Sequence, residues 1–154
     1  MEIRDLLAPE RVVANLKVTS KKQALQELSK KVAAVIGQDE REIFDLLLER
    51  ERLGTTGVGD GIAIPHGKLA SLDRLYGMFA RLERPVNFES IDERPVDLIF
   101  LLLAPESAGA DHLKALARIS RLLRDKKICD KLRGSDTPEA LYALLTEQTT
   151  SRAA

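Results

Sequence analysis

Residues Val96 to Leu103 read VDLIFLLL, a run that is apolar at every position except Asp97. A strand with one face in water alternates apolar and polar residues, whereas a continuous apolar run predicts a strand covered on both faces. A second strand is predicted at Tyr76 to Leu82. Because helical patterns lie on either side of these strands in the sequence, we predict a three-layer α/β domain with helices on both faces of a central sheet.

Two amphipathic helices are predicted ahead of these strands. The first begins at Ser20, where Gln23 completes a capping-box pattern, and ends at Gly37. The second follows Asp39 and spans about residues 40 to 52, with apolar residues recurring at helical spacing. Both helices therefore have one apolar face to pack on the sheet.

Two more helices are predicted after the central strand. Asp111 or a neighbour caps the first, beyond Pro105, and Thr137 ahead of Pro138 starts the second. The residues expected to face inward on the first helix are Leu113, Leu116, Ala117, Ser120 and Leu123. Its cations are expected to form a solvated face: Lys114, Arg118, Arg121 and Arg124. The apolar stripe of the last helix is Leu141, Leu144 and Leu145.

The length of 154 residues suits a single domain, which we predict over 1–154 with a frayed tail at 149–154. The 24 basic and 24 acidic side chains balance, so nonspecific nucleic-acid binding loses its main driving force. No stretch approaches the roughly 20 apolar residues of a membrane span. The single cysteine, Cys129, fits a reducing compartment and a packing role. We expect a soluble cytoplasmic protein without membrane insertion.

Residues Leu53 to Lys68 read LGTTGVGDGIAIPHGK. Four glycines within the eight positions 54–61 exclude a helix and predict an irregular loop, followed by a short strand at 62–64. A P-loop would need glycine at position 62 and a hydroxyl at 69, where Ile62 and Leu69 stand. A dinucleotide-binding turn would also need its third glycine at position 62. We therefore expect no nucleotide cofactor.

His66 is the candidate nucleophile of this segment. Pro65 restricts the backbone before it and Gly67 frees the backbone after it, which favours an imidazole at a strand-to-loop junction. Neutral imidazole is a good nitrogen nucleophile near pH 7, because its ordinary pKa is about 6.5. From the bare residue, a loop histidine that only hydrogen-bonds the backbone is an equal alternative.

Three other side chains are candidates for the same site. His112, at the start of a predicted helix, should stay neutral beside the positive end of the helix dipole and can donate to a phosphoryl oxygen. Arg50, 16 residues before His66, can hold two phosphoryl oxygens, although a charged helix end is the commoner role. Asp60, six residues before His66, can orient the imidazole, or be an ordinary turn residue.

The segment LGTTGVGDGIAIPHGK closely resembles the active-site segment of the mannitol/fructose-class enzyme IIA domains of the bacterial phosphotransferase system. The downstream ADHLKALARISRLL and the lack of an attached transporter domain look most like the nitrogen-regulatory branch. The resemblance implies a mixed central sheet flanked by helices. It also implies His66 as phosphoryl acceptor, His112 beside it and Arg50 steadying the phosphate; Asp60 falls where relatives vary.

This resemblance implies a phosphotransferase component that forms a covalent phosphohistidine and needs no cofactor or metal. An HPr-type phosphocarrier is the expected donor. The phosphorylation state is expected to decide which regulatory target the protein binds, such as a sensor kinase or ion transporter, as in relatives. Such a protein is not a conventional multiple-turnover enzyme.

Three alternatives remain open from the sequence. A sugar-specific IIA would pass the phosphate to a fructose- or mannitol-type IIB subunit. A binding module that has lost phosphorylation would act by docking alone, although intact Arg50, His66 and His112 argue against it. A zinc hydrolase would need ligands from His66, His112, Asp60 and Cys129, which lack the short paired spacings of zinc sites.

Overall fold

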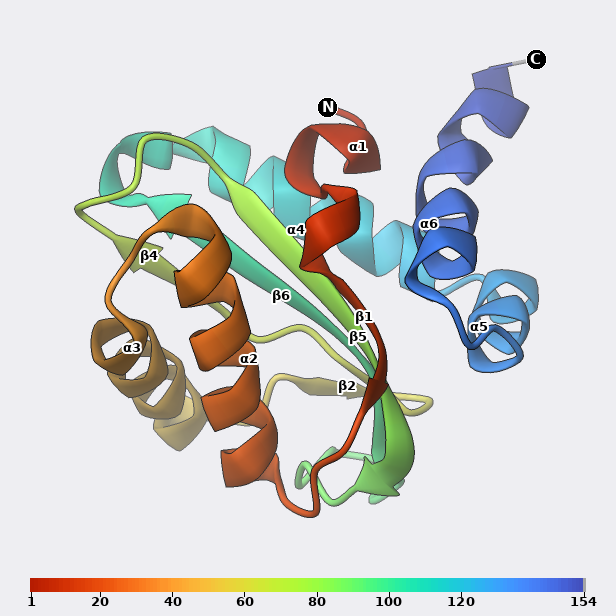
Figure 1. Cartoon of the computed structure of the whole chain (residues 1–154), viewed down its shortest axis with the longest axis horizontal. Coiled ribbons are helices and arrows are strands. Elements are labelled where there is room, and N and C mark those ends of the chain that lie inside the picture. Colours follow the sequence, from red (N-terminus) through yellow and green to blue (C-terminus); the bar gives the residue numbers. More distant parts are fainter. Residues whose placement is uncertain (154) are drawn as a thin grey trace.

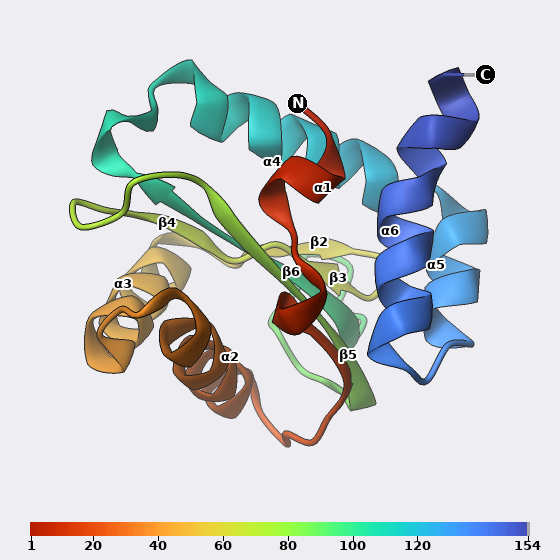
Figure 2. The same cartoon turned by 45° about the horizontal axis from the view of Figure 1, so that its top comes forward.

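The computed structural model describes residues 1–153, with side chains described through Glu147. It has three layers: α2 and α3 cover one face of a central sheet, and α1, α4, α5 and α6 lie on the other (Figures 1 and 2). The elements are α1 Ile3–Leu6, η1 Pro9–Arg11, β1 Val12–Leu16, α2 Lys21–Ile36, α3 Glu40–Leu53, β2 Gly57–Gly59, β3 Ile62–Ala63, β4 His66–Leu69, β5 Tyr76–Val86, β6 Val96–Pro105, η2 Glu106–Ala108, α4 Ala110–Leu123, α5 Lys126–Arg133 and α6 Pro138–Ala153.

The sheet is mixed and has six strands in the order β1-β5-β6-β3-β2, with β4 also paired to β6. β5 runs antiparallel to β6 along one edge of that strand, and β3 and β4 run parallel to it along the other edge. β1 pairs parallel with β5, and β2 pairs antiparallel with β3. The mixed three-layer architecture confirms the predicted fold class.

The central strand β6 supplies both hydrophobic cores. Successive side chains of a strand point to opposite faces, so its alternate residues enter different layers. Ile99, Leu101 and Leu103 pack with α2 and α3, whereas Leu98 and Phe100 pack with α1, α4, α5 and α6. All five are fully buried. The continuous apolar run is thus explained by burial of both faces.

The predicted caps of α2 and α3 are confirmed. The Ser20 hydroxyl accepts a hydrogen bond from the Gln23 backbone N–H at 3.1 Å, and Gly37 ends α2 in the left-handed conformation with φ of 71°. Asp39 caps α3 by accepting from the Arg41 N–H at 3.0 Å. Thr137 likewise accepts from the Ala140 N–H at the start of α6, at 3.1 Å.

The face of α4 that meets the protein interior is partly as predicted: Leu123 is buried and Leu116 packs against the core. Leu113 is 67% exposed and Ala117 is exposed, while Ala115, Ile119 and Leu122 are buried. Both sets satisfy a helical period, and packing of α4 against α1, α5 and β6 decides between them. The N-cap residue is Gly109 rather than Asp111, which lies in the first turn.

The cationic side of α4 is only partly solvated. Lys114, Arg121 and Arg124 are exposed, as predicted. The Arg118 side chain is only 20% exposed and its Nη2 lies 3.8 Å from Glu2 Oε2 of α1. Its assignment to the solvated face was therefore wrong.

Several short elements went unpredicted, namely α1, β1 and β4. The segment expected to be an irregular loop contains a small hairpin, β2–β3, turned at Asp60 and Gly61 with φ of 57° and 80°. An Asp-Gly pair is a typical hairpin turn because both positions adopt positive φ readily. A frayed tail was predicted at 149–154. The side chains of these residues, and residue 154 altogether, lie outside what the structure describes, so the frayed tail stays a prediction. None of the described helices is long and apolar enough to cross a membrane.

Close packing of α3 on β4 gives a testable consequence. A Cβ at position 67 would lie 2.5 Å from Leu46 Cδ2, so any larger residue there forces the Leu46 side chain to shift. We expect Gly67→Ala to lower the free energy of unfolding by about 1–3 kcal/mol, because Leu46 must move outward. Urea unfolding measures this, and adding Leu46→Ala should recover part of the loss. Additive losses in the double variant would contradict the contact.

Candidate functional site

The site is built at a break in the sheet. β3 and β4 pair with the same edge of β6 at different heights, so they are two pieces of one strand interrupted at Ile64–Pro65. The Leu102 N–H still donates to the Pro65 carbonyl oxygen at 2.9 Å, which holds the break against β6. His66 is the first residue of β4, so the predicted junction exists but leads from a break into a strand.

The imidazole of His66 is held by the backbone just before it. Its Nδ1 lies 2.8 Å from the carbonyl oxygen of Ile64. A carbonyl oxygen can only accept, so Nδ1 carries the proton and Nε2 carries the lone pair. The half-buried ring therefore has a defined tautomer whose nucleophilic nitrogen is Nε2.

His112 lies beside His66, as predicted. The ring centroids are 5.7 Å apart with an interplanar angle of 51°. Among the described residues, nothing hydrogen-bonds the buried Nε2 of His112. Burial lowers the pKa of His112, and His66 and Lys68 nearby lower it further, which favours the neutral ring. Burial, rather than the helix dipole invoked from the sequence, is therefore the main reason for the predicted neutral ring.

Arg50 lies in the last turn of α3. Leu46, one helical turn earlier on the same face, packs directly on Gly67 next to His66. The Arg50 Nη1 donates to the Gly54 carbonyl oxygen at 2.9 Å, and the side chain is otherwise partly open to solvent. This bond places the guanidinium at the start of the glycine-rich segment, and its predicted contact with a phosphoryl group on His66 stays a prediction.

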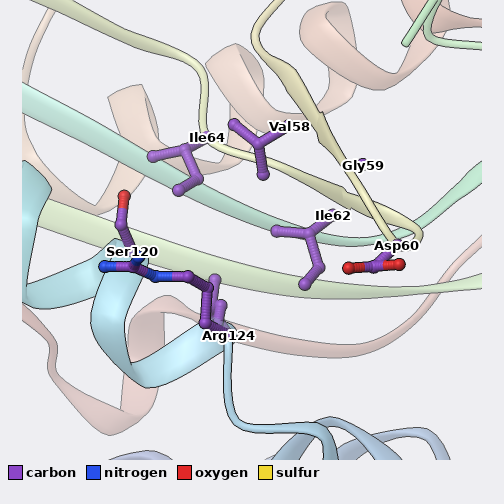
Figure 3. A pocket seen from close by; sticks show the side chains of 8 residues that line it. Val58, Gly59, Asp60, Ile62, Ile64, Ser120 and Arg124 are labelled. Carbon is purple, nitrogen blue, oxygen red and sulfur yellow. The ribbon is translucent and has the colours of Figure 1, made fainter. Parts of the chain in front are cut away.

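Asp60 does not take the orienting role predicted for it. Its carboxylate Oδ1 lies 3.3 Å from Arg94 Nη1, and its backbone N–H donates to Asp92 at 2.9 Å. Figure 3 shows Asp60 at the turn of the β2–β3 hairpin, with Ile64 at the other end. The acceptor for the His66 ring is the Ile64 carbonyl oxygen, a backbone group that no side-chain pattern could reveal.

A pocket of about 380 Å³ lies alongside the β2–β3 hairpin. Figure 3 shows Val58, Ile62 and Ile64 from the glycine-rich segment on one side, and Ser120 and Arg124 from α4 on the other. Its lining is mainly apolar near Ile64. The surface is therefore hollowed between the hairpin and the C-terminal part of α4, and neither His66 nor His112 lines the hollow.

The zinc-site alternative finds no support in the described residues, where no group of three or more His, Cys, Asp or Glu side chains could hold a metal ion. Cys129 lies on α5, is buried, and has its Sγ 3.2 Å from the Leu123 carbonyl oxygen. Burial raises the pKa of its thiol, which favours the inert protonated form. The predicted packing role is confirmed.

The fold matches solved structures of a nitrogen regulatory IIA protein and a mannitol IIA protein. The crystal structure of nitrogen regulatory protein IIA-Ntr from Neisseria meningitidis matches with a TM-score of 0.88 and 35% identity, covering 94% of this chain and 99% of that one. The IIA mannitol structure from Escherichia coli matches with a TM-score of 0.75 at 22% identity, over 90% of this chain and 98% of that one, which shows the fold alone. The class is therefore that of phosphotransferase-system IIA proteins.

The family model described as "Phosphoenolpyruvate-dependent sugar phosphotransferase system, EIIA 2" matches residues 5–148, and the chain belongs to this family. A nitrogen regulatory protein of Bradyrhizobium diazoefficiens is 63% identical over 94% of this chain and 95% of its own length. That of Escherichia coli K12 is 38% identical over 96% of this chain and 91% of its own length. The predicted resemblance to the nitrogen-regulatory branch is confirmed.

The lowered pKa of His112 gives stability a definite pH dependence. The folded state resists protonation more than the unfolded state, whose imidazole titrates near about 6.5, so stability is full above that pH and falls as pH drops toward the lowered folded pKa. We expect wild type to lose more stability than His112→Gln between pH 7.5 and pH 5.5. Urea midpoints at both pH values measure this. Equal losses in the two proteins would contradict it.

Proposed function

We propose that His66 accepts a phosphoryl group on Nε2 from an HPr-type phosphocarrier, and that its phosphorylation state controls a regulatory target. The observation that carries this proposal is the Nδ1 contact with the Ile64 carbonyl oxygen, because it leaves the Nε2 lone pair available. Membership of the family supports the phosphocarrier role.

In the proposed step, the Nε2 lone pair of His66 attacks phosphorus and forms a P–N bond. The P–N bond of the donor phosphohistidine breaks, and its electron pair returns to the donor ring. Positive charge develops on the His66 ring as Nε2 is substituted, and the Ile64 carbonyl oxygen stabilises it through the Nδ1–H bond. A loose transition state of this kind depends mainly on positioning and charge stabilisation.

The neighbouring side chains suit the equatorial oxygens of the transferring group. The buried Nε2 of His112 has no partner among the described residues, and a buried polar atom of this kind normally finds one. As a neutral donor, it would give its N–H to a phosphoryl oxygen. Arg50 would exchange part of its contact with Gly54 for a charge-assisted contact with the same group.

Exposed apolar side chains on the elements that carry the candidate residues, or that lead to them, suit the docking of a carrier protein. Leu53, Val58 and Leu113 are 85%, 61% and 67% exposed, and they stand on α3, β2 and α4. Leu113 directly follows His112, and Val58 lines the pocket beside Ile64. Large apolar side chains in water are typical of binding surfaces when they gather around a reactive group.

The regulatory output is proposed from the relatives. Those named nitrogen regulatory protein cover nearly the whole chain at up to 63% identity, whereas a fructose-specific EIIABC component of Bacillus subtilis is 31% identical and this chain covers 23% of it. Phosphorylation adds nearly two negative charges beside His112, which would change what this surface binds. A sensor kinase or an ion transporter is the expected kind of target, and this protein would meet it from the cytoplasm.

The proposal is tested by phosphorylation. Purified protein is incubated with phosphoenolpyruvate and the upstream phosphocarriers, and its intact mass is measured. We expect wild type to gain one phosphoryl group and His66→Ala to gain none, because only Nε2 of His66 accepts. Unmodified wild type would point to a binding module without phosphorylation. Stoichiometric onward transfer to a fructose- or mannitol-type IIB would point to the sugar-specific alternative.

The supporting roles are tested by transfer rates. We expect Arg50→Ala to slow phosphorylation of His66 about 100-fold and His112→Ala about tenfold, because each removes a group that stabilises the transferring charge. Arg41→Ala is the matched control, since Arg41 is an exposed arginine on the same helix with an 83% exposed side chain. Quenched-flow measurement with circular dichroism checks both rate and fold. Rates equal to that of the control would remove both assignments.

A further inference from the structure

Glu51 is a buried carboxylate that the proposed chemistry does not use. It follows Arg50 in the last turn of α3, and only 8% of the residue is exposed. Burying a carboxylate is costly unless its oxygens are hydrogen-bonded and its charge is paired. Its partners therefore show what the structure gains from placing it there.

Both oxygens of Glu51 are engaged. Oε1 accepts from the Thr56 backbone N–H at 3.0 Å and lies 2.8 Å from Lys21 Nζ, and Oε2 accepts from the Thr56 hydroxyl. Lys21 Nζ is itself fixed from α2, 3.4 Å from the Phe88 carbonyl oxygen and 5.1 Å from the centre of the Phe88 ring. Thr56, at the start of the glycine-rich segment, is thus held at two points by one carboxylate.

Thr56 in turn holds the residue that orients the nucleophile. Its carbonyl oxygen accepts from the Ile64 N–H at 3.0 Å, and the Ile64 carbonyl oxygen accepts from His66 Nδ1 at 2.8 Å. Thr56 and Ile64 are each only 4% exposed, so water competes little for these bonds. A continuous path of hydrogen bonds therefore runs from Glu51 through Thr56 and Ile64 to the imidazole.

From this path we infer that Glu51 and Thr56 are positioning residues that fix the tautomer and orientation of His66. The inference rests on the proposed function for its effect on transfer, but the state of the ring can be measured without any phosphoryl donor. Ile64 directly follows β3, and its N–H faces away from β6 toward the side of β2, so the Thr56 carbonyl oxygen supplies the bond that holds it.

The bonds between Glu51 and Thr56 also bear on Arg50, the cation proposed for the site. Glu51 is adjacent to Arg50, and the bond from Arg50 Nη1 to Gly54 spans the chain between Glu51 and Thr56. Loosening Thr56 would therefore disturb the acceptor of the Arg50 contact together with the carbonyl that holds the ring. A role in stability alone would leave the ring tautomer unchanged.

The experiment compares Thr56→Val, which removes the hydroxyl at nearly constant volume, with Thr56→Ser, which restores it. Ser29→Ala is the matched control, because it removes another buried hydroxyl, bonded to the Leu25 carbonyl oxygen at 2.7 Å in α2. The tautomer of His66 is read from ring nitrogen chemical shifts of the unphosphorylated protein. The rate constant of transfer to His66 is measured with the phosphocarrier.

We expect Thr56→Val to populate the Nε2–H tautomer and to slow transfer roughly tenfold, because a small misplacement of a reacting group is costly. Glu51→Gln should act in the same direction, and Thr56→Ser should restore both readouts. An unchanged tautomer in Thr56→Val, or a rate loss no larger than that of Ser29→Ala at equal folded fraction, would overturn the inference. A wild type that has the expected tautomer yet accepts no phosphoryl group would instead overturn the proposed function.

Discussion

β6 hydrogen-bonds along one edge to two separate strand pieces, β3 and β4, and the two residues between them include the one whose backbone carbonyl orients the His66 ring. The Pro65 carbonyl oxygen accepts from the Leu102 N–H, as the parallel register requires, but Pro65 has no N–H of its own to continue the ladder to β6. Ile64 faces the opposite edge of the strand, where its N–H donates to the Thr56 carbonyl oxygen beside the β2–β3 pairing. Its carbonyl oxygen lies on that same edge and is the acceptor for the His66 ring.

The site joins elements that pack on opposite faces of the sheet. α3 belongs to the layer with α2 and carries Arg50 and Glu51, whereas α4 belongs to the other layer and carries His112. α3 packs against β4, and His66 at the start of β4 lies beside His112 in the first turn of α4. The two helical layers therefore meet at this edge of the sheet. The charged groups come from one layer: α3 carries the cation Arg50 and the carboxylate Glu51. The other layer contributes His112 on α4, whose lowered pKa favours the neutral ring.

Local signals predicted the long elements well. The caps at Ser20 and Asp39 and the stop at Gly37 depend on neighbouring residues only, so they were visible in the sequence. The predicted inward face of α4 was right at Leu123 but wrong at Leu113, because Leu113 and Ala115 both satisfy the helical period and contact with α1, α5 and β6 chooses between them. Strand β4, four residues with an exposed lysine, has no pattern of its own and exists because β6 offers an edge.

The sequence alone determined the doubly covered central strand and the helix ends, because these depend on residue spacing and local backbone preference, and its motif LGTTGVGDGIAIPHGK carried the family resemblance. The roles of His66, His112 and Arg50 remain predictions. Tertiary structure decided that the two histidine rings lie 5.7 Å apart, that Asp60 turns toward Arg94, and that a backbone carbonyl orients the imidazole. These outcomes depend on contacts between residues distant in the chain and on main-chain groups, which every residue carries alike.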